Sequence, residues 1–376
     1  MPGRSALRFG GRPCNAYGMT MPSFKARISA AALAALLAAA PAAFSAEAPA
    51  APADAPEYDL DRTTLIMGTI VRTRVIGRTP EDAKRYAEIA EERLEHFDDT
   101  LSVHKKTALN DVNLRSGETV EVPCEAADLA RASLAAADLT DGAFEPMIGP
   151  VVNLWKIGFG GDRVPSGEAI REAVAKVDRS KVTIDDTPPV CSIRIAKGQF
   201  MDLGGSAKGY IGTSIADSLK AAGMTHGLLD LGGNVVAIGE REPGVPWKVG
   251  IQHPAEGRGG YYAVVEASDE SVITSGAYER YFEENGRRYS HILDPKTGRP
   301  VKTDISSVTI IDRNGTRADA LCTALFSMGW ERACAFLRAH PDLRAVLLHA
   351  DMKRAAVTKS AAGSVKLEPG FEETVI

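Results

Sequence analysis

The sequence predicts an α+β fold with mostly antiparallel, mixed sheets and helices packed on them. Strand-like and helix-like segments alternate from residue 58 onward, and short turns rich in Gly and Pro separate them. Strand-like segments paired as in hairpins outnumber strand–helix–strand units, which favours antiparallel sheets. No internal repeat and no domain boundary is visible after residue 57. Residues 58–376 are therefore expected to form a single compact domain, with a two-lobed arrangement as the alternative.

Periodicity places the elements in the first half of this domain. Residues 69–76 alternate in the manner of a strand. Thr79 is then expected to cap a helix that Pro80 opens, because Thr accepts hydrogen bonds from first-turn amides and Pro suits the first helical position. The expected buried stripe of this helix consists of Ala83, Ala87, Ala90, Leu94 and Phe97. Helices are expected next over about 125–138 and 166–177, and strands over 182–184 and 192–195.

The central part is expected to read strand, Gly-rich turn and helix, over residues 200–203, 204–209 and 211–222. Strands are expected at 227–230 and 235–238, followed by paired strands at 248–251 and 261–266. Near the end, a strand over 307–311 leads into a helix that begins at about Arg317.

Composition excludes one broad class of function. The chain has 376 residues, 44% of them apolar and 25% charged, with a net charge of −5. A nucleic-acid binder would usually carry a basic face, so no nucleic acid is expected among the partners. The net charge says little about phosphate ligands, because backbone amides and metals can hold these locally.

The N-terminal segment has the pattern of a secretory signal peptide. Lys25 and Arg27 precede an apolar run over 28–43, and the small residues Ala46 and Ala48 follow. Residues 1–46 are therefore expected to be a signal peptide with an over-long start, and residues 47–57 an Ala/Pro linker. A membrane anchor is the alternative, but the run is shorter than the ~20 residues that a spanning helix needs. We expect an exported, periplasmic protein, with association with the outer face of the inner membrane as a further expectation.

The cysteines form neither a C-x-x-C pair nor a zinc spacing. Cys14 precedes the apolar run, so it cannot be the lipidated cysteine of a lipoprotein. Cys322 and Cys334 lie in apolar helical patterns and are expected to be core residues. Cys124 and Cys191 could form a disulfide in an oxidising compartment or remain free thiols, and their spacing favours neither.

Two segments contain residues suited to binding a phosphate and a metal. In residues 201–210, adjacent glycines precede a helix, which suits close approach of a phosphate to the backbone. Asp319 and Thr323 stand four apart on an expected helix, so both oxygens project from one face. A carboxylate and a hydroxyl suit Mg²⁺. Taken singly, each has a plain structural alternative: a tight turn, and a helix-start Asp with a Thr facing its neighbours.

His291 is the candidate general base. It lies at an expected strand end before an Asp-Pro-x-Thr-Gly turn, where an imidazole could remove a proton from a hydroxyl at neutral pH. The alternative is a structural histidine. A Ser-His-Asp hydrolase is not expected, because the sequence has no G-x-S-x-G motif.

In combination and in order, these segments resemble the ApbE family of FAD:protein FMN transferases, over nearly all of residues 58–350. The segments that carry the resemblance are Met67-Gly68-Thr69, Gly142-Ala143-Phe144-Glu145-Pro146, Gly149-Pro150-Val151-Val152-Asn153-Leu154-Trp155, the stretch 202–210, Leu231-Gly232-Gly233-Asn234, the stretch 290–300 and Ala318-Asp319-Ala320.

The resemblance implies a function. Proteins of this family bind FAD with a magnesium ion, transfer FMN to a threonine hydroxyl of a partner protein and release AMP. It thus implies FAD as substrate, Mg²⁺ as cofactor, and an exported or membrane-bound redox subunit as the acceptor; it leaves the oligomeric state open. An FAD pyrophosphatase and a non-catalytic periplasmic FAD-binding protein are the alternatives. The presence of Asp319, Thr323 and His291 favours catalysis, because binding alone needs no general base.

The resemblance also implies the site residues. Asp319 and Thr323 match the metal-binding side chains, Gly205 the residue whose carbonyl completes the protein ligands, and His291 the general base. Positions that match contacts to the flavin nucleotide are Met67, His104, Ala143, Phe144, Glu145, Asp202, Lys208 and Leu293. Glu145 stands where the family usually has Asp, and His104 where it commonly has an aromatic residue.

Overall fold

A computed structural model describes residues 57–102, 105–256, 259–276 and 280–376 of the chain. The expected signal peptide, the linker apart from Glu57, and His104 lie outside the described residues. The described residues belong to one compact unit. None of its helices combines the length and apolar character that crossing a membrane requires.

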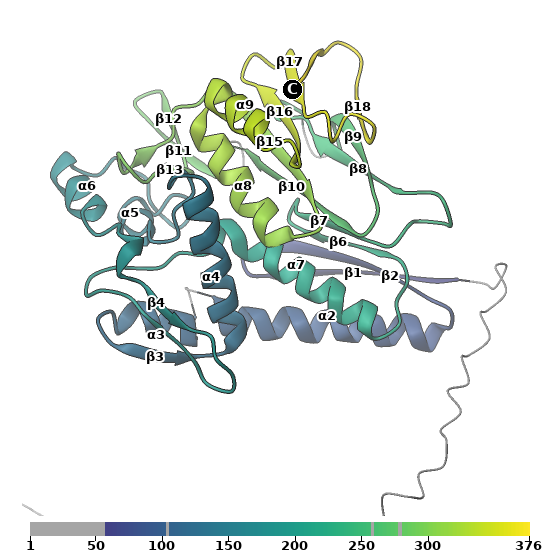
Figure 1. Ribbon diagram of the computed structural model, residues 1–376, viewed down its shortest axis with the longest axis horizontal. Helices are drawn as coiled ribbons and strands as arrows, with labels where there is room; N and C mark the ends of the chain where they lie inside the picture. The colour runs from purple at the N-terminus through teal and green to yellow at the C-terminus, as the bar shows by residue number, and fades with distance from the viewer. Residues whose placement is uncertain (1–56, 103–104, 257–258, 277–279) are drawn as a thin grey trace, which may run out of the picture. The chain divides into compact units, whose positions relative to one another are not determined.

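The fold is α+β, as predicted, and a nine-stranded sheet forms its centre (Figure 1). Every strand pair in it is antiparallel except the last, β17–β19. In spatial order its strands are β1 (Tyr58–Ile66), β2 (Thr69–Gly77), β6 (Gly227–Leu231), β7 (Val235–Ile238), β10 (Glu270–Gly276), β15 (Ile305–Asp312), β16 (Arg344–His349), β17 (Arg354–Val357) and β19 (Glu372–Val375).

Smaller sheets surround this centre. They consist of β18 (Val365–Leu367), β9 (Tyr261–Ala267) and β8 (Trp247–Gln252); of β3 (Thr119–Val122), β5 (Cys191–Arg194) and β4 (Thr183–Asp185); of β11 (Tyr281–Glu284) and β12 (Arg287–Ser290); and of β13 (Leu293–Asp294) and β14 (Arg299–Pro300).

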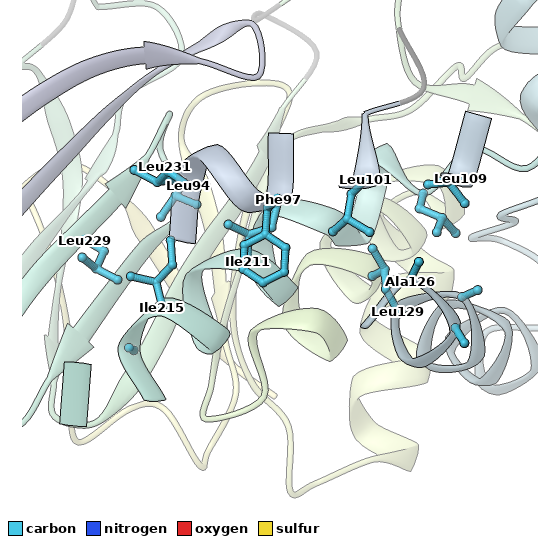
Figure 2. Packing of buried hydrophobic residues seen from close by; sticks show 14 of the residues in the cluster. Leu94, Phe97, Leu101, Leu109, Ala126, Leu129, Ile211, Ile215, Leu229 and Leu231 are labelled. Carbon is cyan, nitrogen blue, oxygen red and sulfur yellow. The ribbon is translucent and has the colours of Figure 1, made fainter. Parts of the chain in front are cut away.

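The helices are α2 (Pro80–Leu101), α3 (Ala108–Leu114), α4 (Cys124–Leu139), α5 (Gly149–Trp155), α6 (Gly167–Val174), α7 (Gly204–Ala221), α8 (Gly315–Met328) and α9 (Trp330–Ala339), with a 3-10 turn, η1, at Arg179–Lys181. The predicted cap and buried stripe of α2 are confirmed. The Thr79 hydroxyl accepts a hydrogen bond from the Asp82 amide, and all five stripe residues are buried. This stripe packs against α7 and β6 through Ile211, Ile215 and Leu229 (Figure 2).

Strands β10, β15, β16 and β17 of the main sheet are buried on both faces. On β10, Ile273 joins the core cluster beneath α8 and α9, while Val272 joins the cluster beneath the β18-β9-β8 sheet. On β16, Leu347 belongs to the cluster beneath α8 and α9, and Val346 to the cluster beneath the β18-β9-β8 sheet. Successive side chains of a strand point to opposite faces, so these strands form near-continuous apolar runs without the alternation by which strands are usually recognised. Of the strands in the main sheet, β1, β10, β16, β17 and β19 were not predicted.

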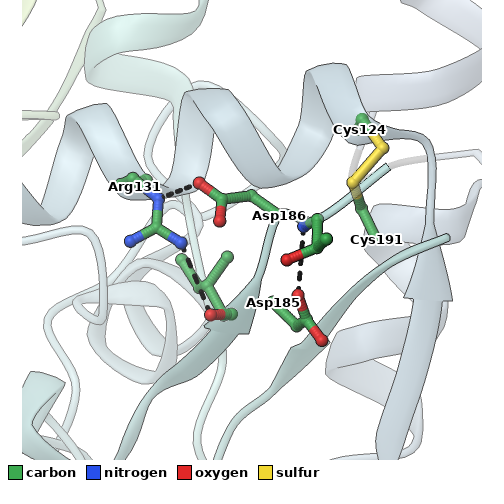
Figure 3. The surroundings of a disulfide bond; sticks show 7 residues. Cys124, Arg131, Asp185, Asp186 and Cys191 are labelled. Carbon is green, nitrogen blue, oxygen red and sulfur yellow. Dashed lines mark hydrogen bonds and ion pairs between the residues drawn. A yellow bond between two sulfur atoms is a disulfide. The ribbon is translucent and has the colours of Figure 1, made fainter. Parts of the chain in front are cut away.

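The cysteines divide into one disulfide and two core residues. Cys124 and Cys191 are bonded, which joins the start of α4 to β5 (Figure 3). The chain between them contains η1 and β4, and Arg131 of α4 also pairs with Asp186, beyond β4. Closing a loop of 67 residues in the unfolded chain corresponds to a stabilisation of about 4 kcal/mol in the chain-entropy description. Cys322 and Cys334 are buried free thiols, as predicted.

Candidate functional site

The Gly-rich segment begins a helix, which corrects the predicted strand and turn. Residues 201–203 are not a strand, and α7 already starts at Gly204. Instead of strand pairing, the side chain of Asn113 binds both the amide and the carbonyl of Met201, at 2.6 and 3.0 Å. The apolar residues before Gly204 predicted a strand, but Met201 and Leu203 are apolar because they are buried in the core and not because they lie in a sheet.

Glycines in α7 allow helix α8 to approach closely. A Cβ atom on Gly209 would lie 2.0 Å from the carbonyl oxygen of Gly315, at the start of α8. The Gly209 amide donates a hydrogen bond to Asp319 Oδ2 at 3.0 Å. The hydroxyl of Thr213, one turn further along α7, donates to the Gly209 carbonyl and accepts from the Gly315 amide. The two helices are thus joined where Asp319 faces α7.

The three candidate metal ligands lie together at this junction. Asp319 and Thr323 are both on α8, as predicted, one turn apart. A Cβ atom on Gly205 would lie 3.4 Å from Thr323 Oγ1 and 3.0 Å from the ring of Phe144. The absence of a side chain at position 205 therefore keeps the α7 backbone close to Thr323 and Phe144.

The donor set fits a hard divalent cation. Asp319 is 3% exposed, and no basic side chain of the described residues forms an ion pair with it. A buried carboxylate without a partner charge is costly, so a cation would compensate it. No cluster of three His, Cys, Asp or Glu side chains that could hold a metal occurs in the described parts of the chain. One carboxylate, one hydroxyl and one carbonyl, completed by ligand oxygens, suit Mg²⁺ better than zinc.

Asp202 and Lys208 lie on either side of Gly205. Asp202 Oδ1 accepts a hydrogen bond from the Gly204 amide at 2.8 Å, and the Asp202 amide donates to the Pro146 carbonyl at 2.7 Å. This second bond joins the start of α7 to the segment that contains Phe144. Lys208 is half-buried, and its positive charge contributes to lowering the pKa of His291.

His291 is a neutral imidazole whose Nδ1 is held by a hydrogen bond. It follows β12 directly and precedes the turn that joins β13 to β14, as predicted. Its Nδ1 lies 3.2 Å from the Arg280 carbonyl oxygen. A carbonyl only accepts hydrogen bonds, so Nδ1 carries the proton and Nε2 keeps its lone pair. Burial, with smaller contributions from the Arg280 and Lys208 charges, lowers the pKa of His291 to about 4. The imidazole is therefore uncharged at neutral pH.

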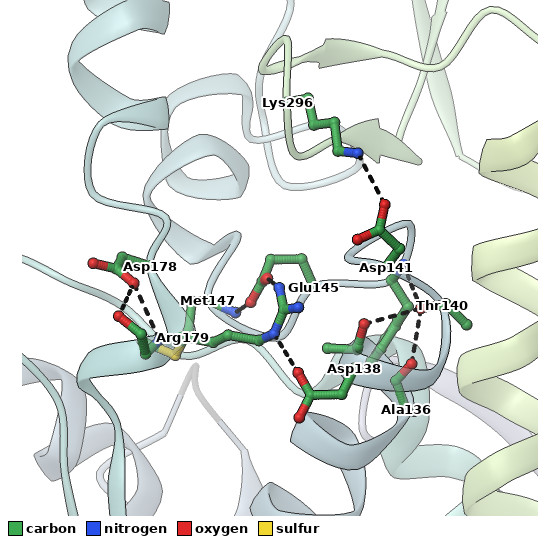
Figure 4. Close-up of polar contacts among 12 residues, drawn as sticks. Ala136, Asp138, Thr140, Asp141, Glu145, Met147, Asp178, Arg179 and Lys296 are labelled. Carbon is green, nitrogen blue, oxygen red and sulfur yellow. Dashed lines mark hydrogen bonds and ion pairs between the residues drawn. The ribbon is translucent and has the colours of Figure 1, made fainter.

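An ion pair fixes the loop that carries Ala143, Phe144 and Glu145 (Figure 4). Glu145 is 6% exposed; its Oε1 accepts from the Met147 amide and its Oε2 from Arg179 Nη1, at 3.0 and 2.8 Å. Arg179, on η1, also binds Asp138 at the end of α4. Phe144 is buried against Ala320 and Ala324 of α8. The loop is thus held from outside by Arg179 and from inside by α8.

Met67 and Leu293 occupy separate apolar surroundings. Met67 and Gly68 form the two-residue turn between β1 and β2, both with positive φ, which matches the type I′ hairpin turn. Met67 packs at the edge of the α2–α7 core. Leu293 is buried in the cluster around Trp155. Both residues belong to clusters other than the one that contains Phe144.

Two functional-site neighbours had no signal in the sequence. Arg179 is 34 residues from Glu145, and Arg280 contributes its carbonyl oxygen, which is independent of its side chain. The sequence also did not predict the contact between Gly209 and Gly315. Gly209 nevertheless belongs to the segment that was expected to bind phosphate.

The family model of the ApbE family matches residues 67–347 of this chain. The chain belongs to the ApbE family. The FAD:protein FMN transferase of Treponema pallidum is 37% identical over 82% of this chain and 88% of its own. The protein of the same name from Klebsiella pneumoniae is 33% identical over 76% of this chain and 88% of its own. The crystal structure of the ApbE protein of Thermotoga maritima superposes with a TM-score of 0.71 and 31% identity, covering 83% of this chain and 97% of that one.

The Arg179–Glu145 pair generates a prediction about this ApbE chain. Arg179→Met should lower the free energy of unfolding by about 1–3 kcal/mol, because it leaves a buried carboxylate without its cation. The double variant with Glu145→Gln should recover at least half of this loss. Denaturant unfolding measures both.

The control is Arg115→Met, which removes an arginine whose partner, Glu118, is exposed. Exposed pairs contribute at most about 1 kcal/mol, so this variant should unfold almost as the wild type does. Equal losses for Arg115→Met and Arg179→Met would contradict a specific role for the buried pair.

Proposed function

We propose that this protein is an FAD:protein FMN transferase that moves FMN from FAD to a threonine hydroxyl of an acceptor flavoprotein and releases AMP. Membership of the ApbE family and the shared name of the curated relatives support the transferase activity. Mg²⁺ as cofactor and threonine as acceptor are the finer parts of the proposal.

One observation carries the proposal. The start of α7, the Phe144 loop and α8 meet at Gly205, where the backbone approaches Phe144 and Thr323 to within contact distance. Backbone and side-chain oxygens for a cation, the N-terminus of α7 for phosphate oxygens and the ring of Phe144 for an apolar group are thereby next to one another. An FAD molecule offers all three of these partners: a metal-binding pyrophosphate, anionic oxygens and an aromatic ring system.

Asp319, Thr323 and the Gly205 carbonyl would hold Mg²⁺. When bound, the ion would offset the negative charge of the pyrophosphate oxygens, a role that metals commonly have in phosphoryl transfer. Residues of the chain itself also contribute to binding the phosphates. The amides at the start of α7 and the half-buried Lys208 supply further positive potential for the phosphates.

His291 would take the proton of the attacking hydroxyl. The threonine oxygen forms a bond to the phosphorus of the FMN half, the pyrophosphate bond to AMP breaks, and AMP leaves with the electron pair. The hydroxyl proton passes to Nε2 of His291, which has a lone pair because Nδ1 donates to the Arg280 carbonyl. The lowered pKa keeps this nitrogen unprotonated at neutral pH.

The two alternatives differ from a transferase in different ways. A pyrophosphatase would replace threonine by water, and the names of the relatives favour protein as the acceptor. A non-catalytic FAD carrier needs neither a compensated buried carboxylate nor an imidazole with a free Nε2. The geometry around Asp319 and His291 therefore supports a catalytic function, and the names of the relatives support transfer to a protein.

We also propose that the protein is exported and acts in the periplasm, on an acceptor that is itself exported or membrane-bound. The signal-peptide pattern of residues 1–46 motivates this proposal. The Cys124–Cys191 disulfide supports it, because disulfides persist in oxidising compartments and are rare in the cytosol.

Removal of the Asp319 charge tests the metal site. Asp319→Asn keeps an oxygen for the Gly209 amide and removes the charge, so Mg²⁺-dependent FMN transfer should fall by at least ~100-fold. Isothermal titration should show that Mg²⁺ no longer strengthens FAD binding, while the melting temperature changes little. Asp217→Asn, an exposed carboxylate on α7, is the control and should behave as wild type. Full activity of the wild type in excess EDTA would contradict the metal assignment.

Substitution of His291 tests the base. His291→Asn should slow transfer by ~10²–10⁴-fold and leave the FAD dissociation constant and melting temperature nearly unchanged. Because the pKa of His291 is about 4, the wild-type rate should hold as pH falls to about 5 and decrease only near pH 4, where Nε2 becomes protonated. His340→Asn is the matched control. A parallel loss of stability and FAD affinity would instead indicate a structural histidine.

The length of the mature chain tests export. Intact-mass analysis of the periplasmic fraction should give an N-terminus between residues 46 and 49, as the small residues there indicate. Recovery of the uncleaved chain in the membrane fraction would favour an anchor instead.

A further inference from the structure

A large cavity lies beside the catalytic candidates and is formed by other residues. Its volume is about 800 Å³, within the range of small-molecule and peptide sites. Three segments line it: β12, the stretch from β14 to the start of β15, and the connection from α8 to α9. In Figure 1 these segments lie together near the labels β12 and α9.

The wall of the cavity is connected through the backbone to the segment that carries His291. Ser290, in its wall, directly precedes His291. Val301, also in the wall, donates its backbone amide to the Ile292 carbonyl at 2.9 Å, so the cavity and His291 share one piece of backbone. Met328, a third wall residue, packs at the edge of the cluster that contains Phe144. A chain lying in this cavity would therefore reach His291 within a few residues.

The lining has an excess of positive charge. It contains four basic side chains, and in the described parts of the chain three of them, Arg287, Lys302 and Arg332, form no ion pair with an acid. All three are exposed. Of the two acids, Asp304 accepts the Trp330 amide at the start of α9, where the helix dipole offsets its charge.

The aromatic parts of the wall are held from behind. Tyr289 stacks on Phe282 with ring centroids 5.1 Å apart, and it also packs on Trp155. Trp330 meets His349 edge to face at 5.2 Å. These contacts fix the wall before any partner arrives, so the basic side chains project from a preformed surface.

We propose that this cavity binds an acidic segment of the acceptor protein and so presents its threonine to His291. The inference rests on the proposed function, because it names the docking site of the second substrate. The chain as a whole carries a charge of −5, so an acidic partner would be repelled except where a local basic surface attracts it. Such a surface fixes the orientation of the encounter, which is what delivery of one hydroxyl to one base requires.

The test removes the basic side chains of the cavity that form no ion pair. In one variant Arg287, Lys302 and Arg332 are all replaced by Ala. The probes are two fluorescein-labelled decapeptides with a single central threonine, one with four flanking aspartates and the other with asparagines at those positions. Fluorescence anisotropy at low salt should show that the wild type binds the aspartate peptide about 10-fold more tightly than the asparagine peptide. The variant should bind both alike, and 0.5 M salt should remove the wild-type preference.

The matched control removes the same number of exposed basic side chains elsewhere: Lys248→Ala, Lys359→Ala and Lys366→Ala in one chain. This control should keep the wild-type preference. Equal binding of the two peptides by the wild type, or an unchanged preference in the cavity variant, would overturn the proposal.

FAD binding separates the inference from the function on which it rests. The cavity variant should bind FAD with the wild-type dissociation constant. A loss of FAD affinity would show that the cavity belongs to the FAD site, and the docking proposal would then be wrong. Failure of the wild type to release AMP from FAD in the presence of both Mg²⁺ and an acceptor flavoprotein would count against the proposed function, whatever the peptides do.

Discussion

The close contact between α7 and α8 is the constraint on which the site depends. Gly209 has no room for a side chain against the Gly315 carbonyl, and its amide donates to Asp319. Glycine in a helix interior costs about 0.5–1 kcal/mol relative to alanine. Here it allows a backbone amide of one helix to reach a carboxylate of the next, and this also brings Thr323 to the Gly205 backbone.

Three buried titratable groups, Asp319, His291 and Glu145, determine the electrostatics of the proposed site. Asp319 is buried and lacks a basic partner among the described residues, which makes it a place for a cation. His291 is buried with Lys208 and Arg280 nearby, which keeps it neutral. The buried carboxylate of Glu145 is neutralised by Arg179, so it does not compete with Asp319 for a metal. A site for a cation and a neutral base are therefore compatible in this protein.

The main sheet and the disulfide hold the elements that converge on this region. Strands β10 and β15 lie beneath α8, and the disulfide joins α4 to β5 on the side where η1 delivers Arg179. Apart from Asp319 and Thr323 inside α8, the residues of the proposed chemistry come from the start of α7, the end of β12 and the loop after α4. The proposed docking cavity is lined by the same β12 strand and by residues at the C-terminal end of α8.

The local sequence pattern was sufficient to predict several helices and the positions of several candidate site residues. The cap and stripe of α2, the α8 pair Asp319 and Thr323, and the position of His291 before its turn were predictable, because each depends on residues within a few positions of one another. The strand predicted at residues 200–203 was wrong, because Asn113 takes the backbone bonds of Met201 and burial makes the segment apolar. Strands β10 and β16 were missed since both of their faces are buried and the alternation of apolar residues is lost. Only the tertiary structure decided the disulfide, the Arg179–Glu145 pair and the contact of Gly209 with Gly315, because each joins residues more than 30 positions apart, which no local periodicity encodes.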